Sequence, residues 1–559
     1  MMRFLLKSLV LLIFVSSLTV LAQEKEYVDT AIVNRIKDEA LKRSQVMDIA
    51  SSLTDVYGPR LTGSPQLMRA NEWTKKKFEE WGLQNARLEA WGPFGFGWTL
   101  ERYALGATIL GEKNLRLASF PVISYPKAWS AEPKAKKGEV VLLEIKSEED
   151  FAKYKGKLKG KFIMVSDFRA PKLNDKPIAK RHDNESLLPL SNSTTQTLQS
   201  FKIPPTSPEE LKQRQLTYLR TKFLFEEEPA AILDLTYRGT AGSVSISGAT
   251  MPPPAMDTPW QSRPKVYEQP KGVLTQISLN PEHYGRIFRA LKKGMKVEME
   301  IDMKVSFNES KECFNTIAEI PGTDPKLKDE VVMLGAHIDS WHTGTGATDN
   351  GAGTATMMEA VRVLQEVFKS TGVKPKRTIR IGLWSGEEQG LFGSFYHVKK
   401  NFGDLPDYLL WDDEGKGKDT ILVKEAYHRF AGYFNLDNGG GHIRGIYLQQ
   451  NDACRNIFRA WLEPFAEWNS TTVASSNTGG TDHLSFDAIG LPGFQFIQDP
   501  MEYGTFTHHS NMDTYERLVA EDMMRNAAIV ASFVYHTAMR SEKLPRKPVK
   551  SVIATGGSK

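Results

Sequence analysis

Five short stretches in the C-terminal half of the chain carry a histidine or a carboxylate at, or just after, the end of an expected strand. They are residues 337–339, 349–351, 386–388, 436–438 and 508–510. In an open α/β sheet the carboxyl ends of the strands meet at one edge, where side chains from several strands assemble a site. Histidines and carboxylates are ligands that zinc accepts. The pattern therefore predicts an α/β sheet with a metal site at its edge.

Alternating apolar segments from residue 315 onward predict the strands and helices of that sheet. Residues 331–336 form an uninterrupted apolar run, which is typical of a central strand covered on both faces. Residues 351–368 follow with apolar side chains at helical spacing. The predicted fold class is α/β, with a mixed central sheet flanked by helices. Further strands are expected over 377–384, 429–436 and 492–497, and further helices over 390–400 and 515–538.

The N-terminal half has a different pattern. Apolar periodicity predicts helices over residues 29–57 and 64–81, joined by a turn-rich loop. From about residue 120, short β runs alternate with polar or proline-rich stretches. These runs predict a separate β-rich domain over 121–302, inserted into the main domain, and no catalytic group of residues is recognisable in it. The β runs are residues 139–144, 161–165 and 230–234.

The N-terminus has the three parts of a secretory signal peptide. Arg3 and Lys7 supply charge, residues 9–20 are apolar, and residues 20–22 precede a cleavage site. The apolar run is too short for a comfortable membrane span, so we expect a secreted or periplasmic protein with no membrane span in its mature form. The expected segments are the signal peptide (1–22), an N-terminal part of the main domain (23–120), the inserted domain (121–302), the main domain (303–541) and a basic tail (542–559).

Charge and cysteine content set further bounds. The chain of 559 residues has a formal net charge of +5, and removing Arg3 and Lys7 with the signal peptide leaves 5 − 2 = +3. An excess this small over such a length does not indicate nucleic-acid binding. The chain has two cysteines, Cys313 and Cys454, and the sequence leaves open whether they pair.

Two pairs of residues carry most of the chemical argument. Residues two apart in a strand point to the same side, so Asp339 is placed to orient the imidazole of His337 and to raise its basicity. Glu387 and Glu388 are adjacent carboxylates, which repel each other unless a cation lies near. One of them can bind a metal while the other takes a proton from water.

The other candidate positions also have ordinary structural interpretations. Asp349 precedes a helix, where it can be an N-cap, and its two oxygens can also bridge two metal ions. Asp437 precedes a glycine-rich turn, where aspartate is common without any function. His508 and His509 are not expected to aim at one point from an extended backbone, so one is expected to be a ligand and the other a neighbour. Asp482 is either a supporting residue or part of an ordinary loop.

Together these motifs resemble the co-catalytic di-zinc exopeptidases, a family that includes aminopeptidases and glutamate carboxypeptidases. The matching stretches are residues 57–64, 337–340, 346–353 and 385–394. The resemblance implies a phosphorylase/hydrolase-like α/β zinc peptidase domain, a protease-associated domain inserted over 121–302, and two Zn²⁺ per chain. The residues that it implies as metal ligands are His337, Asp349, Glu388, Asp437 and His509, with Glu387 as the general base and Asp339 as the orienting carboxylate.

The activity implied by the resemblance is hydrolysis of dipeptides or small peptides by an aminopeptidase, dipeptidase or carboxypeptidase. Several relatives have a tyrosine directly before the last histidine ligand, where it supports the developing oxyanion. This chain has His508 there, so Tyr503 or His508 is the expected substitute, and Asp482 is expected behind the ligands. The choice between amino and carboxyl ends stays open, as does the oligomeric state, a homodimer included.

Two other functions are compatible with the same fold. A receptor-type binding protein would have lost ligands or the base, whereas the proposed ligands and Glu387 are all present. A glutaminyl cyclase-like transferase, which uses one zinc, would lack the first histidine, and His337 is present. The complete set therefore favours a hydrolase, with small peptides as partners and no nucleic acid.

Overall fold

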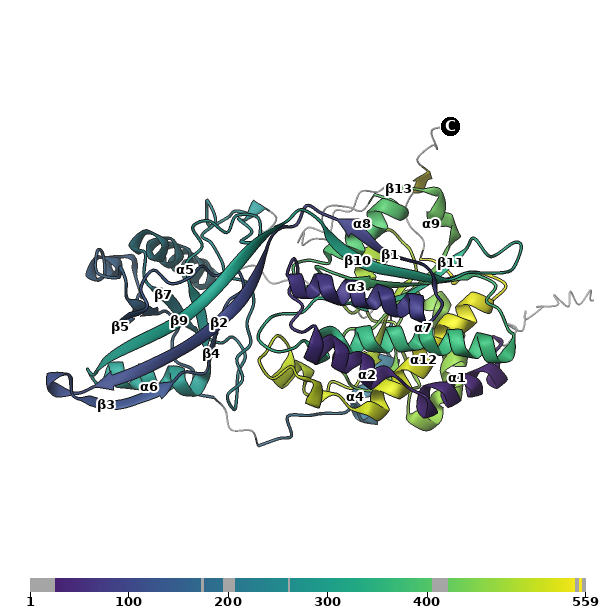
Figure 1. The fold of residues 1–559 in the computed structure, drawn as a ribbon, viewed down its shortest axis with the longest axis horizontal. Helices are drawn as coiled ribbons and strands as arrows, with labels where there is room; N and C mark the ends of the chain where they lie inside the picture. Colours follow the sequence, from purple (N-terminus) through teal and green to yellow (C-terminus); the bar gives the residue numbers. More distant parts are fainter. Residues whose placement is uncertain are drawn as a thin grey trace, which may run out of the picture.

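The computed structural model describes residues 26–171, 175–194, 207–259, 262–404, 421–547 and 552–554. The expected signal peptide over 1–22 lies outside these residues. The described chain forms two lobes, each built on an eight-stranded sheet (Figure 1). The long strands β2 (Gly95–Leu110) and β9 (Lys296–Ser310) run through the second lobe toward the first (Figure 1).

The sheet of the first lobe has the strand order β1-β10-β12-β11-β14-β17-β15-β16. Its centre is parallel, from β12 through β11 and β14 to β17, whereas β10 and β15 pair antiparallel with their central neighbours. This mixed sheet confirms the predicted fold class. The strands are β1 (Gln84–Trp91), β10 (Cys313–Ile320), β11 (Val331–His337), β12 (Thr378–Trp384), β14 (Phe430–Asn435), β15 (Ile443–Tyr447), β16 (Thr472–Ala474) and β17 (Gly493–Gln498).

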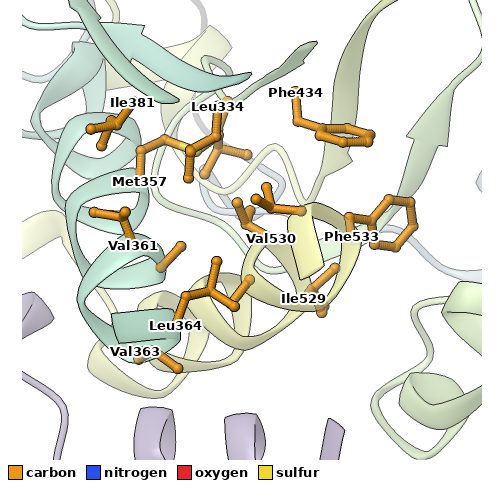
Figure 2. Close-up of a cluster of buried hydrophobic side chains, with 14 of the residues drawn as sticks. Leu334, Met357, Val361, Val363, Leu364, Ile381, Phe434, Ile529, Val530 and Phe533 are labelled. Atoms are coloured by element: carbon orange, nitrogen blue, oxygen red, sulfur yellow. The ribbon is translucent and has the colours of Figure 1, made fainter. Parts of the chain in front are cut away.

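Helices cover both faces of this sheet. On one face, Leu364 of α7 and Phe533 of α12 pack with Phe434 of β14 in a large buried apolar cluster (Figure 2). On the other face, Phe486 of α11 and Trp384 of β12 belong to a second, smaller cluster. The first face is covered by α1 (Thr30–Lys42), α2 (Val46–Ser51), α3 (Pro65–Glu80), α7 (Ala352–Thr371), α10 (Arg455–Leu462) and α12 (Ala520–Met539), and the second by α8 (Phe392–Asn401), α9 (Glu425–Arg429) and α11 (His483–Asp487).

The predicted helices of the N-terminal half are present with one difference. The helix expected over 64–81 is α3, whose N-cap Ser64 accepts a hydrogen bond from the Leu67 backbone N–H. The helix expected over 29–57 is interrupted between α1 and α2. At this break the Arg43 carbonyl accepts a hydrogen bond from Arg362, and the Gln45 N–H donates to Glu359, so contacts with α7 stabilise the turn.

The second lobe also contains a mixed sheet, with the order β3-β2-β9-β5-β6-β7-β8-β4. The strands β5 to β8 pair parallel with one another, and β9 and β4 pair antiparallel with their neighbours. The remaining strands are β3 (Arg116–Pro121), β4 (Ser124–Pro126), β5 (Lys137–Leu142), β6 (Phe162–Met164), β7 (Ala231–Leu235) and β8 (Gln276–Leu279), and the helices are α5 (Pro208–Glu227) and α6 (Pro281–Lys292). Helix α4 (Asn184–Ser191) comes between β6 and α5 in the chain but packs against β16 and β17 of the first lobe (Figure 1).

The inserted segment is longer than the expected 121–302. Trp91 of β1 pairs with Cys313 of β10 in the first sheet, and Gly95 of β2 pairs with Ser310 of β9 in the second. The inserted segment therefore runs from residue 92 to residue 312, and the strands pass from one sheet to the other almost without interruption. It forms the second lobe except for α4 and the residues just before it, which contact the first lobe. The boundary predicted from the sequence was wrong because apolar and polar residues alternate along β2 and β9 as in any other strand. No stretch with the composition of a linker separates these strands from β1 and β10.

The described part of the basic tail packs against the first lobe. Leu544 is buried in the large apolar cluster, and the Lys547 ammonium lies 2.5 Å from the Asp487 carboxylate. Further on, β18 (Val552–Ala554) pairs with β13 (Ile421–Val423). Among the described helices, none combines the length and the apolar character that a membrane crossing requires.

Candidate metal centre

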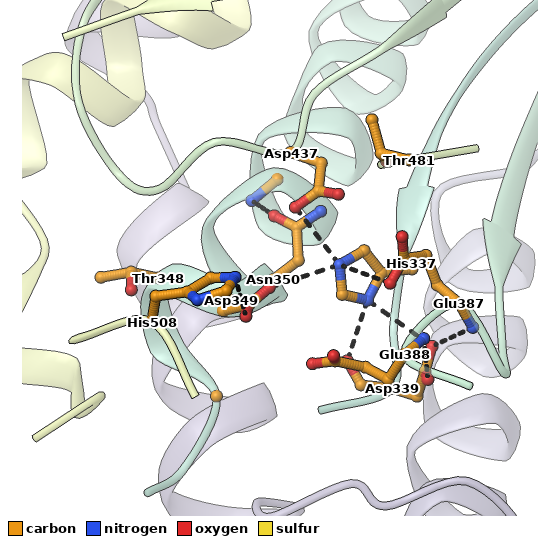
Figure 3. Close-up of polar contacts among 12 residues, drawn as sticks. His337, Asp339, Thr348, Asp349, Asn350, Glu387, Glu388, Asp437, Thr481 and His508 are labelled. Atoms are coloured by element: carbon orange, nitrogen blue, oxygen red, sulfur yellow. Dashed lines mark hydrogen bonds and ion pairs between the residues drawn. The ribbon is translucent and has the colours of Figure 1, made fainter. Parts of the chain in front are cut away.

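The predicted site residues meet at the carboxyl edge of the parallel strands in the first lobe (Figure 3). His337 is the last residue of β11, Glu387 and Glu388 follow β12, and Asp437 follows β14. Asp349 lies in the turn that leads from β11 into α7. The prediction that these strand ends share one edge is therefore correct in its geometry.

His337 lies at the centre of the first group of potential ligands. Its Nε2 atom is 3.3 Å from Asp437 Oδ1, 3.5 Å from Asp349 Oδ1 and 3.9 Å from Glu387 Oε2 (Figure 3). Its Nδ1 atom is 3.1 Å from the backbone oxygen of Asp339 and 3.5 Å from the Asp339 carboxylate. Asp339 therefore orients His337 mainly through its main-chain carbonyl.

The Asp339 carboxylate holds the turn that carries the two glutamates. Its oxygens accept the backbone N–H groups of Glu387 and Glu388, both at 3.3 Å, and the Thr62 hydroxyl at 2.9 Å. A fully buried carboxylate needs such donors. Asp339 thus fixes the position of the acidic pair as well as that of the first histidine.

Asp349 connects the first group to a second one. Its Oδ2 atom is 3.3 Å from His509 Nε2, and His509 Nε2 is 3.0 Å from Glu388 Oε2. Its other oxygen, Oδ1, faces His337, so the two oxygens of Asp349 face two different histidines. This is the placement that a carboxylate bridging two cations requires.

His508 and His509 do face the same point, contrary to the expectation for adjacent residues. Their rings stack at 3.8 Å with an interplanar angle of 20°, and His508 Nε2 is 3.8 Å from Asp349 Oδ2. The reason lies in the backbone, because His509 has a positive φ of 56° and the chain is not extended there. The left-handed conformation turns both side chains toward the pocket.

Several buried atoms of the site have no hydrogen-bond partner among the described residues. They are His337 Nε2, Asp349 Oδ2, Glu388 Oε1 and Asp437 Oδ1. Buried polar atoms nearly always have a hydrogen-bond partner. These four atoms are therefore better explained as ligands of cations than as polar atoms left without a partner. Two sets of potential ligand atoms lie within 4.8 Å of one another, and nitrogen and carboxylate donors suit zinc. The sets are His337 with Asp349 and Asp437, and Asp349 with His508 and His509.

The electrostatics of the site also indicate missing positive charge. Burial raises the pKa of Glu387 and Glu388 well above the ordinary value, and the neighbouring carboxylates raise it further. Burial lowers the pKa of His337, but Asp437 and Glu387 outweigh burial and bring it well above its usual range. Burial opposes ionisation of Asp349, yet His337 and His509 hold its pKa below the ordinary value. The carboxylates thus draw any available positive charge toward themselves.

Asp482 and Tyr503, the two supporting residues expected from the sequence, flank this cluster. Asp482 is fully buried with both carboxylate oxygens unpartnered, and burial raises its pKa to about 7. Tyr503 lines the pocket beside the ligands, and its ring lies 4.8 Å from the His508 ring. The pocket measures about 330 Å³ and also contains Glu387, Leu391 and Leu484.

Two residues that the sequence motifs did not single out, Arg60 and Asp513, shape the loop around Asp349. The buried Arg60 guanidinium donates to the carbonyls of Ile338 at 2.6 Å and Gly346 at 2.9 Å, and burial lowers its pKa to about 10. Asp513 accepts the backbone N–H groups of Thr348 at 2.6 Å and Asp349 at 3.1 Å. The turn-rich loop at 57–64 was the available signal for Arg60, but its partners lie far away in sequence.

The sequence of this lobe matches known proteins. Residues 315–534 match the model of Peptidase family M28. Carboxypeptidase Q from Mus musculus is 31% identical over 258 residues, which cover 46% of this chain and 48% of the relative. Leupeptin-inactivating enzyme 1 from Streptomyces exfoliatus is 29% identical over 180 residues, or 32% of this chain and 34% of that protein. The chain spans about half the length, or less, of these curated relatives.

Two solved structures have a similar fold over most of the chain. The peptidase M28 precursor from Shewanella amazonensis has a TM-score of 0.60 and 22% identity, with 93% of this chain and 98% of that chain covered. BSAP, a zinc aminopeptidase from Bacillus subtilis, has a TM-score of 0.51 and 16% identity, with 89% and 95% covered. These structures support the fold, while the family match identifies the lobe. The chain therefore carries a domain of peptidase family M28, as the resemblance of its motifs predicted.

Proposed function

We propose that the chain is a zinc-dependent exopeptidase that hydrolyses dipeptides or small peptides. The observation that carries this proposal is a group of four ligand atoms without a hydrogen-bond partner, on His337, Asp349, Glu388 and Asp437. The three carboxylates line one pocket, and His337 Nε2 lies behind them, 3.3 Å from Asp437 Oδ1. The names of the relatives, a carboxypeptidase, a leupeptin-inactivating enzyme and a zinc aminopeptidase, support the same class of reaction. The predicted signal peptide supports a secreted or periplasmic location.

The five proposed ligands divide between two zinc ions. His337 and Asp437 would hold one ion, His509 and Glu388 would hold the other, and Asp349 would bridge them, because its oxygens face both histidines. When bound, zinc lowers the pKa of a coordinated water to about 7 and polarises a carbonyl oxygen. Asp339 keeps the ligands in place through its contacts with His337 and with the turn at Glu387.

Glu387 is the proposed general base. Its carboxylate lines the pocket 3.9 Å from His337 Nε2, and burial raises its pKa, which suits a group that accepts and returns a proton. Glu387 takes a proton from water as the oxygen adds to the scissile carbonyl carbon. It then passes that proton to the amine nitrogen as the C–N bond breaks, so no proton is gained or lost overall.

The size of the pocket favours small substrates. A volume of about 330 Å³ accommodates a few residues, not a folded protein. The glycines and apolar side chains around the glutamates leave room for peptide side chains of modest size. The second lobe is the proposed protease-associated domain, and peptides blocked at one end distinguish recognition of a free amino end from recognition of a free carboxyl end.

The test is hydrolysis of a dipeptide panel and of longer peptides blocked at either end, with zinc or with a chelator. Glu387→Gln should lower kcat by about 10²- to 10⁴-fold while zinc content stays that of the wild type. Glu388→Gln is the matched control, and it should lose zinc as well as activity. Wild-type protein that holds zinc but cleaves nothing, or a fully active Glu387→Gln variant, would sink the proposal.

A further inference from the structure

A segment of the second lobe docks directly on the loop that carries both histidines. After β7, the Ile246 N–H donates to the His509 carbonyl at 3.0 Å, and the Asn511 N–H donates to the Val244 carbonyl at 3.2 Å. The Ser245 hydroxyl donates to the His508 carbonyl at 3.3 Å. These contacts join residues that are far apart in sequence, and they place this segment of the second lobe beside the histidine loop.

Two adjacent side chains of this segment reach the outer nitrogens of the two histidine rings. The Tyr237 hydroxyl is 3.2 Å from His509 Nδ1, and Arg238 Nη1 is 3.2 Å from His508 Nδ1. A neutral imidazole carries one proton on one of its two nitrogens. The partner of Nδ1 therefore decides whether Nε2, which faces the pocket, presents a lone pair or a proton.

Arg238 allows only one arrangement for neutral His508. A guanidinium has donors and no acceptor, so His508 Nδ1 must accept the hydrogen bond. The proton of neutral His508 is then on Nε2, beside the Asp349 carboxylate. In that state His508 is a hydrogen-bond donor toward the pocket and is not a metal ligand through Nε2.

Tyr237 allows the opposite arrangement for His509. A phenol oxygen can accept a hydrogen bond, so His509 can donate from Nδ1 and present a lone pair on Nε2. That atom lies among the carboxylates of Asp349 and Glu388, where a cation would also be bound. A hydrogen bond of this kind orients a ligating histidine and raises its basicity.

We propose that Tyr237 and Arg238 of the second lobe assign different tasks to the two adjacent histidines. Tyr237 positions His509 as a metal ligand. Arg238 positions His508 as a donor to the substrate carbonyl oxygen while negative charge develops on it. The inference rests on the proposed zinc peptidase function and adds that the second lobe completes the site.

The experiment measures zinc affinity by competition with a chelator, and kcat at saturating zinc, in the full-length protein. Tyr237→Phe should weaken zinc binding by about 10- to 100-fold and recover activity when zinc is in excess. Arg238→Met should lower kcat by about 10-fold or more without changing zinc affinity, and Arg238→Lys, which keeps a donor, should restore much of the loss. Both residues are exposed, so the variants should fold.

Two further variants separate this proposal from simple docking of the lobes. Ser245→Ala removes only the contact with the His508 carbonyl and should leave zinc affinity and kcat unchanged. His508→Ala should keep the wild-type zinc content and lose kcat. The proposal is overturned if His508→Ala loses zinc, if Ser245→Ala reproduces either effect, or if Tyr237→Phe and Arg238→Met change the same quantity. Failure of the proposed function is recognised separately, because wild-type protein would then bind no zinc or cleave no peptide.

Discussion

The two sheets of the molecule have similar architecture and different chemistry at their edges. Both are eight-stranded and mixed, with parallel strands at their centres. In the first sheet the parallel strands lead into His337, the glutamate pair and Asp437. In the second, β6, β7 and β8 end in Met164, Leu235 and Leu279. Within the described residues, both sets of potential metal ligands belong to the first lobe.

This difference shows that a parallel sheet offers a place for a site and that the residues after the strands decide whether one forms. The second lobe contributes to the same site in another way. The loop after β7 crosses to the first lobe and places Tyr237 and Arg238 against the two histidines. One lobe therefore supplies the potential ligands, and the other contacts two of these residues from outside.

The largest expected effect is the loss of activity when a histidine of the first lobe is replaced by alanine. A histidine of the second lobe, replaced in the same way, is the control. His337→Ala removes the central donor of the first group, and zinc contributes several kcal/mol to such reactions, so activity should fall by about 1,000-fold. His283→Ala, in α6 of the second lobe, should leave zinc content and kcat unchanged. Elemental analysis and dipeptide hydrolysis measure both variants. Equal losses in the two variants would mean that the chemistry is not confined to the first lobe.

A somewhat smaller effect is expected when one buried aromatic side chain is removed from the core of each lobe. Phe434→Ala removes a fully buried ring that packs 5.7 Å from Phe533, and Phe162→Ala removes a fully buried ring of the second lobe. Each should lower the free energy of unfolding of its own lobe by about 3 to 5 kcal/mol because a cavity remains. Hydrogen exchange followed by mass spectrometry locates the loss.

Only Phe434→Ala should also weaken zinc binding, because β14 leads directly into Asp437. If both variants loosen both lobes to the same extent, then the continuous strand pairs β1–β10 and β2–β9 make the lobes one unfolding unit. The two lobes would then differ in their chemistry but unfold together.

The smallest expected effect concerns the two cysteines, which are free and buried. Cys313 lies where the strands pass between the lobes, and burial raises its pKa to about 12; burial also raises the pKa of Cys454, in the first lobe. Since the thiolate is the reactive form, native protein at pH 8 should take up no iodoacetamide by intact mass. Reaction of Cys313 alone would reveal opening between the lobes, and denatured protein, in which both thiols react, is the control.

Much of the first lobe was predictable because its signals are local. The apolar run at 331–336 and the helical spacing over 351–368 correspond to β11 and α7. The potential ligands each stand at the end of such an element, so their meeting follows from the geometry of an α/β sheet. The ligand roles themselves stay a prediction until zinc is measured.

The second lobe was predicted less well. The boundary at 121 missed β2 and β3, and the helix α5 was not expected within a β-rich domain. Where a chain passes from a strand of one sheet into a strand of another, the alternation of apolar and polar residues does not change. Neither the docking of the tail at Leu544 nor the burial of Arg60 had a local signal, because their partners are distant residues.

The sequence by itself determined which residue types stand at which strand ends, because apolar periodicity and turn composition are set within windows of a few residues. Tertiary structure alone decided where the two histidine rings point and what they contact. The positive φ of His509 turns both rings toward one point, and Tyr237 reaches His509 across 272 residues of chain. Such a contact depends on how two lobes pack, and packing is a property of the whole fold that no local pattern records.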